Sequence, residues 1–171
     1  TGASSGIGEA AALRLARAKK SLILCARRKQ KLEALKKECL KQGAVDVICL
    51  TLDVTKPAPL KTFLKQNPKI KVHSLINSAG LAQGTELIQS ANLSDWDAMI
   101  DTNIKGLMYT TRTLLEHIIA EQGHIVNLGS VAGHLVYEGG AVYCATKFAV
   151  RAFSDGLRMD LKGTGVRVTN I

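Results

Sequence analysis

The sequence predicts an α/β fold in which a parallel sheet is covered by helices on both faces. Three observations support this prediction. Short apolar runs with the pattern of buried strands alternate with longer amphipathic segments along the whole chain. A glycine-rich turn at residues 1–8 leads directly into an alanine-rich helix pattern. Several strands end in small or polar residues, at the edge where open parallel sheets bind their ligands.

Length and composition limit the classes of protein that fit. At 171 residues with 46% hydrophobic content, the chain suits one domain with a core, residues 1–171. No apolar run reaches the ~18 residues of a membrane span, so no membrane partner is expected. The histidines lack zinc-ligand spacing, and we expect no metal. The cysteines lack Cys-x-x-Cys spacing, which favours reduced thiols in a cytoplasmic protein; they are Cys25, Cys39, Cys49 and Cys144.

The net charge of +9 is unevenly distributed. Residues 1–71 hold 16 Lys and Arg against 5 Asp and Glu, whereas residues 72–171 hold 7 against 9. A basic half is compatible with nucleic acid, with a phosphorylated small molecule or with a solvated lysine-rich face. Aromatic residues make up only 4% of the chain, which argues against base stacking and against a nucleic-acid partner.

The opening segment has the features of a phosphate-binding turn. Gly2, Gly6 and Gly8 allow a tight turn and let a bulky anion approach the main chain. The N–H groups and the dipole of the following helix attract phosphate. The spacing Gly-x-x-x-Gly-x-Gly is moderately specific, and a plain glycine-rich loop is the alternative. The strand expected before this turn is absent from the sequence, so we expect the domain to be incomplete at both ends.

The second strand, expected over residues 21–26, is followed by Arg27 and Arg28. In a dinucleotide-binding βαβ unit an acid at this position binds the adenosine ribose, whereas an arginine accommodates a 2′-phosphate. The pair therefore favours NADP(H) over NAD. A solvated charge run at the start of the next helix is the alternative for both arginines.

The remaining pattern continues the alternation. We expect helices over residues 30–41, 57–66, 94–120 and 140–162, and strands over 45–52, 72–76, 125–130 and 166–171. Residues 81–93 form a loop, and Ser94 begins a capping-box variant. The strand order 3-2-1-4-5-6 then makes this a Rossmann-type, doubly wound sheet.

Polar residues at three positions along this pattern are candidates for function. Asp53 follows a strand and is placed to hold an adenine amino group or to cap a helix. Asn77 follows the next strand, either ordering the sheet edge or forming a turn. Asn103 interrupts a helix, with Gly106 three residues later; such a local violation indicates a functional site, with an exposed Asn as the alternative.

Tyr143 and Lys147 stand four residues apart in a predicted helix, so they share one face. A cation a few Å from a phenol favours the phenolate and lowers the pKa of that phenol. A phenol tuned in this way exchanges a proton with an alcohol or a carbonyl near neutral pH. Ser130 hydrogen-bonds the same oxygen if the loop between them folds back. An ordinary surface pair is the alternative for an isolated Tyr-x-x-x-Lys.

Taken together, the motifs resemble the short-chain dehydrogenase/reductase family over the whole chain. Its markers, in chain order, are residues 1–8, Asp53 with Val54, residues 77–80, Asn103, Ser130 and residues 143–147. Ser78 departs from the family, which usually has a second Asn there. The expected cofactor-binding residues are Gly2, Ser4, Ser5, Gly6, Ile7, Gly8, Arg27, Arg28, Asp53, Val54, Asn77, Ala79, Gly80, Tyr143 and Lys147.

The resemblance implies a catalytic tetrad. Tyr143 would be the acid/base on the substrate oxygen, and Ser130 would orient that oxygen. Lys147 would lower the pKa of the phenol and bind the nicotinamide ribose. Asn103 would hold a water that links Lys147 to solvent. Ser130 and Tyr143 are therefore also the expected substrate contacts.

A narrower likeness, in residues 95–107, 137–140 and 148–151, is to bacterial NADP-dependent 3-hydroxy acid dehydrogenases that oxidise serine and allo-threonine. It implies a small hydroxy or keto substrate and a homotetramer, or a homodimer. A reductase of 3-oxoacyl thioesters or other ketones is the main alternative, and a non-catalytic NADP- or RNA-binding module is a distant one. A serine hydrolase is disfavoured because Leu128 and Ala132 replace the glycines that flank a nucleophilic serine.

Overall fold

The computed structural model describes all residues, 1–171, and it is an α/β protein with five parallel strands. The strands are β1 (Leu22–Ala26), β2 (Val47–Thr51), β3 (Ser74–Asn77), β4 (His124–Asn127) and β5 (Arg167–Asn170). The helices are α1 (Gly6–Arg17), α2 (Lys29–Lys41), α3 (Ala58–Gln66), α4 (Leu93–Met99), α5 (Leu107–Ala120) and α6 (Ala141–Asp160). Short helical turns are η1 (Ile88–Ser90), the π-helix η2 (Ile100–Gly106) and η3 (Val131–Gly133).

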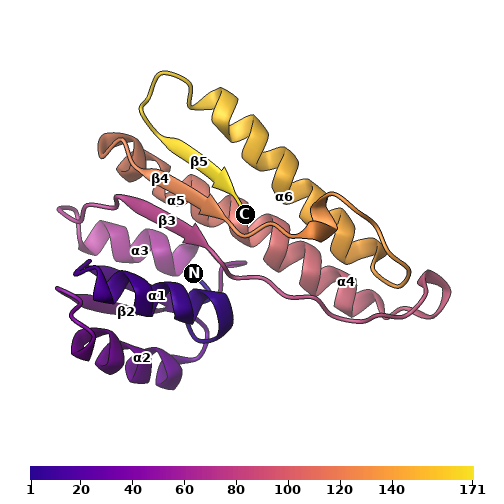
Figure 1. The fold of residues 1–171 in the computed structure, drawn as a ribbon, viewed down its shortest axis with the longest axis horizontal. Helices are drawn as coiled ribbons and strands as arrows, with labels where there is room; N and C mark the ends of the chain where they lie inside the picture. The colour runs from indigo at the N-terminus through magenta and orange to yellow at the C-terminus, as the bar shows by residue number, and fades with distance from the viewer.

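The strands form two groups, β1–β2 and β3–β4–β5, and the first residues of the chain lie between them (Figure 1). The Ala3 N–H donates to Cys25 O at 3.2 Å, on the β1 side. The Thr1 amino group donates to Ile76 O at 2.8 Å, on the β3 side. The order across the molecule is therefore β2, β1, residues 1–3, β3, β4, β5, which is the arrangement predicted for a Rossmann-type sheet.

Alternate residues of β1 pack into two separate hydrophobic cores. Leu22 and Leu24 join the cluster that contains residues of α1 and α2. Ile23 and Cys25 join the cluster that contains residues of α3, α5 and α6. Because successive strand residues point to opposite faces, helices cover both faces of the sheet, as the sequence predicts.

Two predicted boundaries differ from the structure in ways that affect the site. Helix α4 begins at Leu93, because the Asn92 side chain caps it by accepting from the Ser94 N–H at 3.0 Å. The predicted capping box at Ser94 is therefore wrong by two residues. Strand β4 ends at Asn127 rather than at Ser130, since the ladder with β5 ends there and the chain then turns into η3.

The predicted interruption of the long helix near Asn103 is confirmed. Helices α4 and α5 are joined by η2, one π-helical segment, and Asn103 is 2% exposed within it. π-helical segments carry an extra residue in the helical path and are frequent at functional sites.

Two further properties follow from the whole chain. None of the helices combines the length and apolar character needed to cross a bilayer. All four cysteines are free thiols. The cytoplasmic location stays a prediction.

Candidate active site

A cavity of about 580 Å³ opens where β1, β2 and β3 end. Most of the predicted site residues line it: Gly2, Ser4, Ser5, Gly6, Ile7, Arg27, Arg28, Asp53, Val54, Ala79, Gly80, Tyr143 and Lys147. The other four predicted residues, Gly8, Asn77, Asn103 and Ser130, are not on its wall. Lining residues that were not predicted are Cys25, Ala26, Leu52, Ser78, Leu81, Ala82, Thr102, Leu128 and Gly129.

The glycine-rich turn packs directly on the segment that follows β3. Gly2 has a φ of +67°, and a Cβ on it would lie 2.8 Å from Ser78 O. The Thr1 hydroxyl accepts hydrogen bonds from the Ser78 and Ala79 N–H groups, both at 3.1 Å. Only a residue without a side chain, and with access to positive φ, fits at Gly2. The turn and the 78–80 segment therefore form one continuous wall.

Helix α1 presents its N-terminus to this wall. Ser5 is the N-cap residue and its side chain makes no capping hydrogen bond to the first turn. The backbone N–H groups there have no side-chain cap, and the helix dipole adds partial positive charge. Such an end suits a phosphate group.

Arg28 lies over the hydroxyls of the glycine-rich turn. Its Nη2 donates to Ser4 Oγ and to Ser5 Oγ, both at 2.8 Å, and its Nε donates to Ser4 Oγ at 3.1 Å. Residues from the end of β1 and the start of α1 are thus brought together from 24 positions apart in sequence. The group offers several hydrogen-bond donors to an anion.

Asp53 is the acid of the cavity. Partial burial raises the pKa of its carboxyl group, but hydrogen bonds from Thr55 and the nearby charge of Arg27 outweigh burial, so the net shift is downward. The Thr55 N–H donates to Asp53 Oδ1 at 3.0 Å and the Thr55 hydroxyl at 2.8 Å. Both bonds use Oδ1, so Oδ2 can accept from an amino group in the cavity.

Lys147 combines burial with a single hydrogen bond. It is 8% exposed, and its Nζ donates to Leu128 O at 2.8 Å. The Nζ lies 5.7 Å from the centroid of the Tyr143 ring, within range of a cation–π contact. Burial lowers the pKa of Lys147. The predicted Tyr–Lys pair is therefore formed on one face of α6, at the cavity.

Ser130 lies just beyond the cavity wall, and its loop does fold back onto α6. Its Oγ accepts from the Ala132 N–H at 3.1 Å, which caps η3. A Cβ on Gly133 would lie 2.9 Å from Lys147 O, so η3 packs on the backbone of α6. The Ser130 hydroxyl keeps its proton to donate.

Asn103 uses its side chain to join three segments. Its Oδ1 accepts from the Leu81 N–H at 2.9 Å, and its Nδ2 donates to Leu81 O at 2.8 Å and to Thr146 Oγ1 at 3.1 Å. Thr146 in turn donates to Tyr143 O at 2.7 Å. The side chain thus ties η2 to α6 and to the segment after β3. The water expected beside Asn103 stays a prediction.

Asn77 faces the interior rather than the cavity. Its Nδ2 donates to Thr111 Oγ1 and to Asn127 Oδ1, both at 2.9 Å. It holds the sheet edge, one of the two possibilities left open by the sequence.

Two contributors to the site are not among the residues predicted from the sequence: Thr146 and the Leu128 carbonyl. The position of Thr146 between Tyr143 and Lys147 is the feature of the sequence that could have indicated its role. A backbone carbonyl has no sequence signal.

The sequence is similar to that of known proteins over its whole length. The family model described as short chain dehydrogenase matches residues 1–171. A sulfoacetaldehyde reductase of Chromohalobacter salexigens is 46% identical, over all of this chain and 68% of that protein. An NADP-dependent 3-hydroxy acid dehydrogenase of Escherichia coli K12 is 42% identical with the same coverage.

Solved structures give the same result. A serine dehydrogenase from Escherichia coli superposes with a TM-score of 0.92 at 41% identity, covering 99% of this chain and 78% of that one. A closed form of serine dehydrogenase complexed with NADP⁺ superposes with a TM-score of 0.90 at 40% identity, covering 99% of this chain and 68% of that one. The chain therefore belongs to the short-chain dehydrogenase family and is an oxidoreductase.

Proposed function

We propose that the protein uses NADP(H) to oxidise the hydroxyl group of a 3-hydroxy acid or a β-hydroxy amino acid, such as serine or allo-threonine, or to reduce the matching ketone. The observation that carries this proposal is the make-up of the cavity. It holds Arg28 with Ser4 from one half of the sheet, and Tyr143 with Lys147 from the helix packed on the other half.

The residues of the cavity fit NADP(H). The α1 N-terminus and the glycine-rich turn suit the pyrophosphate. The Arg28 guanidinium and the Ser4 and Ser5 hydroxyls suit the 2′-phosphate, since Arg forms bidentate pairs with phosphate. Asp53 Oδ2 suits the adenine amino group. When bound, the cofactor supplies the hydride donor or acceptor.

The chain's own residues then move and hold the proton at the substrate oxygen. In oxidation Tyr143 accepts the hydroxyl proton as the substrate carbon loses its hydride, and in reduction it returns that proton. Ser130 donates a hydrogen bond to the same oxygen. Lys147 places its charge beside the Tyr143 ring, with its Nζ 5.7 Å from the ring centroid.

The substrate class rests on chemistry that several relatives share. In a 3-hydroxy acid, in serine and in the alcohol formed from sulfoacetaldehyde, one carbon separates the reacting carbon from the carbon or sulfur that bears the acid. The second candidate function is therefore reduction of sulfoacetaldehyde itself, favoured by the 46% identity to a reductase of that compound.

The test measures absorbance at 340 nm with the purified protein and NADP⁺ or NAD⁺. The hydroxy compounds are L-serine, allo-threonine, 3-hydroxybutyrate and 2-hydroxyethanesulfonate, with lactate as control because its hydroxyl is next to the carboxylate. We expect turnover with NADP⁺ and at least one of the first four, and none with lactate. Preference for lactate, or for long 3-oxoacyl thioesters in the reduction direction, would overturn the substrate class.

Tyr143→Phe tests the acid/base role. We expect kcat to fall by roughly 10²- to 10⁴-fold, the usual contribution of a positioned proton-transfer group, while NADP(H) binding followed by fluorescence is retained. Tyr137→Phe is the matched control, because Tyr137 is 53% exposed and makes no cation–π contact with a lysine. Activity above a tenth of wild type in the Tyr143 variant would remove that residue from its role.

We further propose that the protein assembles as a homotetramer through the exposed apolar side chains of η2, α5 and α6, among them Ile100, Tyr109 and Phe148. Large apolar groups exposed on the surface of one subunit are typical of subunit interfaces.

A further inference from the structure

A chain of buried hydrogen bonds crosses the carboxyl ends of β3 and β4. Asn77 Nδ2 donates to Thr111 Oγ1 of α5 and to Asn127 Oδ1, and Asn127 Nδ2 donates to Ser154 Oγ of α6, all at 2.9 Å. Ser154 Oγ donates onward to Val150 O at 2.7 Å. Asn127 and Ser154 are both 0% exposed. The four side chains therefore link two helices through two strands, without access to water.

These are the elements that carry the candidate catalytic residues. Helix α5 continues from η2, which holds Asn103. Helix α6 holds Tyr143 and Lys147, and β4 leads directly to Leu128 and Ser130. A shift of α6 along β4 would thus move two members of the site relative to the other two.

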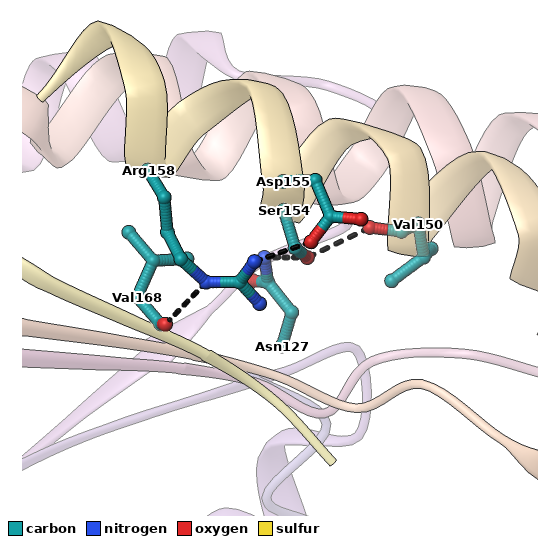
Figure 2. A network of polar contacts seen from close by, with 6 residues as sticks. All are labelled: Asn127, Val150, Ser154, Asp155, Arg158 and Val168. Atoms are coloured by element: carbon teal, nitrogen blue, oxygen red, sulfur yellow. Dashed lines mark hydrogen bonds and ion pairs between the residues drawn. The ribbon is translucent and has the colours of Figure 1, made fainter.

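The Asn127–Ser154 hydrogen bond fixes the position of α6 along β4, because Ser154 lies on the same helical face as Lys147. Lys147 and Ser154 are about two helical turns apart on one face of α6. They bond to neighbouring residues, Lys147 to Leu128 O and Ser154 to the Asn127 side chain. Figure 2 shows the Ser154 bonds and, one turn later, Arg158 donating to Val168 O of β5 at 2.9 Å. A shift of α6 by one residue moves the helix by about 1.5 Å and turns it by about 100°, which would turn these three side chains away from their partners.

We infer that Asn127 and Ser154 are positioning residues: their buried hydrogen bond sets the register of α6 on β4 and thereby places the Lys147 ammonium between the Leu128 carbonyl and the Tyr143 ring. For its effect on turnover the inference rests on the proposed function, whereas the placement of Lys147 can be measured without turnover. Tyr143 is the titratable group that faces Lys147, and none of the salt bridges includes that lysine.

The experiment compares Ser154→Ala, Ser154→Thr and Leu157→Ala in the whole protein. Ser154→Ala removes the acceptor of the Asn127 bond, and Ser154→Thr keeps a hydroxyl. Leu157→Ala is the matched control, since Leu157 lies in the core of the same helix and has no part in the hydrogen-bond chain. Ser154→Cys, which nearly keeps the side-chain volume, replaces Ser154→Ala if that variant does not fold.

In the oxidation direction, we expect Ser154→Ala to lower kcat about 10- to 100-fold, the scale of a misplaced catalytic group. Ser154→Thr, which keeps the hydroxyl, should restore kcat. An unchanged kcat in Ser154→Ala, or an equal loss in Leu157→Ala, would overturn the inference.

The measurement that does not need turnover is acetylation of Lys147, followed by mass spectrometry and normalised to the exposed Lys162. We expect Ser154→Ala to acetylate several-fold faster at Lys147 than wild type, and Ser154→Thr and Leu157→Ala to match wild type. Equal rates in all four proteins would refute the positioning role. A protein that passes this labelling test but turns over no substrate would contradict the proposed function alone.

Discussion

Two cations that line the cavity differ in how far water reaches them. Arg28 is exposed and its donors are held by the Ser4 and Ser5 hydroxyls, whereas Lys147 is buried and bonds to one carbonyl. An exposed guanidinium costs little to keep charged and is available to a phosphate. Burial disfavours the charged form of an ammonium group. The benefit of Lys147 to the protein therefore comes from the group that it faces.

Arg28→Ala should weaken NADP binding much more than NAD binding. Loss of charge-assisted hydrogen bonds to a phosphate, worth about 1.5–3 kcal/mol, corresponds to a roughly 10- to 100-fold rise in the NADP dissociation constant. Calorimetric titration with each cofactor measures this ratio. Lys29→Ala, next along the chain and also exposed, is the control. Equal losses for NADP and NAD would assign Arg28 to a solvated charge run.

Lys147→Met should change how stability depends on pH. Because burial lowers the folded-state pKa below the ordinary 10.5, the unfolded state binds more protons between those two values. The free energy of unfolding of the wild type therefore increases with pH between the two pKa values. Below the lower value, the wild type bears the full cost of burying the charge. Urea unfolding from pH 7 to pH 10.5 should show that the free energy of unfolding of the wild type increases relative to that of Lys147→Met. A difference that stays constant with pH would contradict this prediction.

At the scale of elements, η2 determines what Asn103 can reach. The π-helical segment lets the Asn103 side chain bond both Leu81 and Thr146 while α4 and α5 stay joined. Gly106 ends η2 against Val54, so the segment also packs on the cavity wall. The sequence signals this interruption through Asn103 and Gly106, three residues apart, because both residue types lower helix propensity.

The same substitution should have opposite effects at two helical glycines. A Cβ on Gly106 would lie 2.5 Å from Val54 Cγ2, whereas a Cβ on Gly156 of α6 meets nothing within 4 Å. We expect Gly106→Ala to destabilise by about 1–3 kcal/mol through overpacking. Gly156→Ala should stabilise by roughly 0.5–1 kcal/mol through helix propensity. Denaturant unfolding measures both, and equal signs would contradict the packing at Val54.

At the scale of the whole molecule, residues 1–3 hold the two strand groups in one order. Their backbone and the Thr1 hydroxyl reach Cys25 O, Ile76 O and the N–H groups after β3. The cavity lies across that junction, so its two halves come from segments far apart in sequence.

If the protein is a homotetramer, Phe148→Glu and Tyr109→Glu should yield smaller species. Each places a charge on an apolar side chain that is 40% exposed, and burying an unpaired charge in an interface is costly. Light scattering after size-exclusion chromatography measures the mass. Val45→Glu, at a 68% exposed position beside α2, is the control. An unchanged mass in both helix variants would exclude this interface.

The sequence alone determined the class of fold, the positions of most helices and strands, and the pairing of Tyr143 with Lys147. These depend on local periodicity, glycine-rich turns and the four-residue spacing on a helix, all of which act within short segments. The boundary of α4 was not among them, because one capping side chain, that of Asn92, decides it.

Only the tertiary structure decided which polar residues face the cavity and which hold it in place. Asn77 and Asn103 carry the same side chain as any surface asparagine, yet each is buried and hydrogen-bonded to other segments. Leu128 contributes a carbonyl, and Ser154 a hydroxyl, whose partners lie 19 and 27 residues away. A hydrogen bond needs its two groups within about 3 Å, and the distance between such remote groups is set by packing of the whole chain.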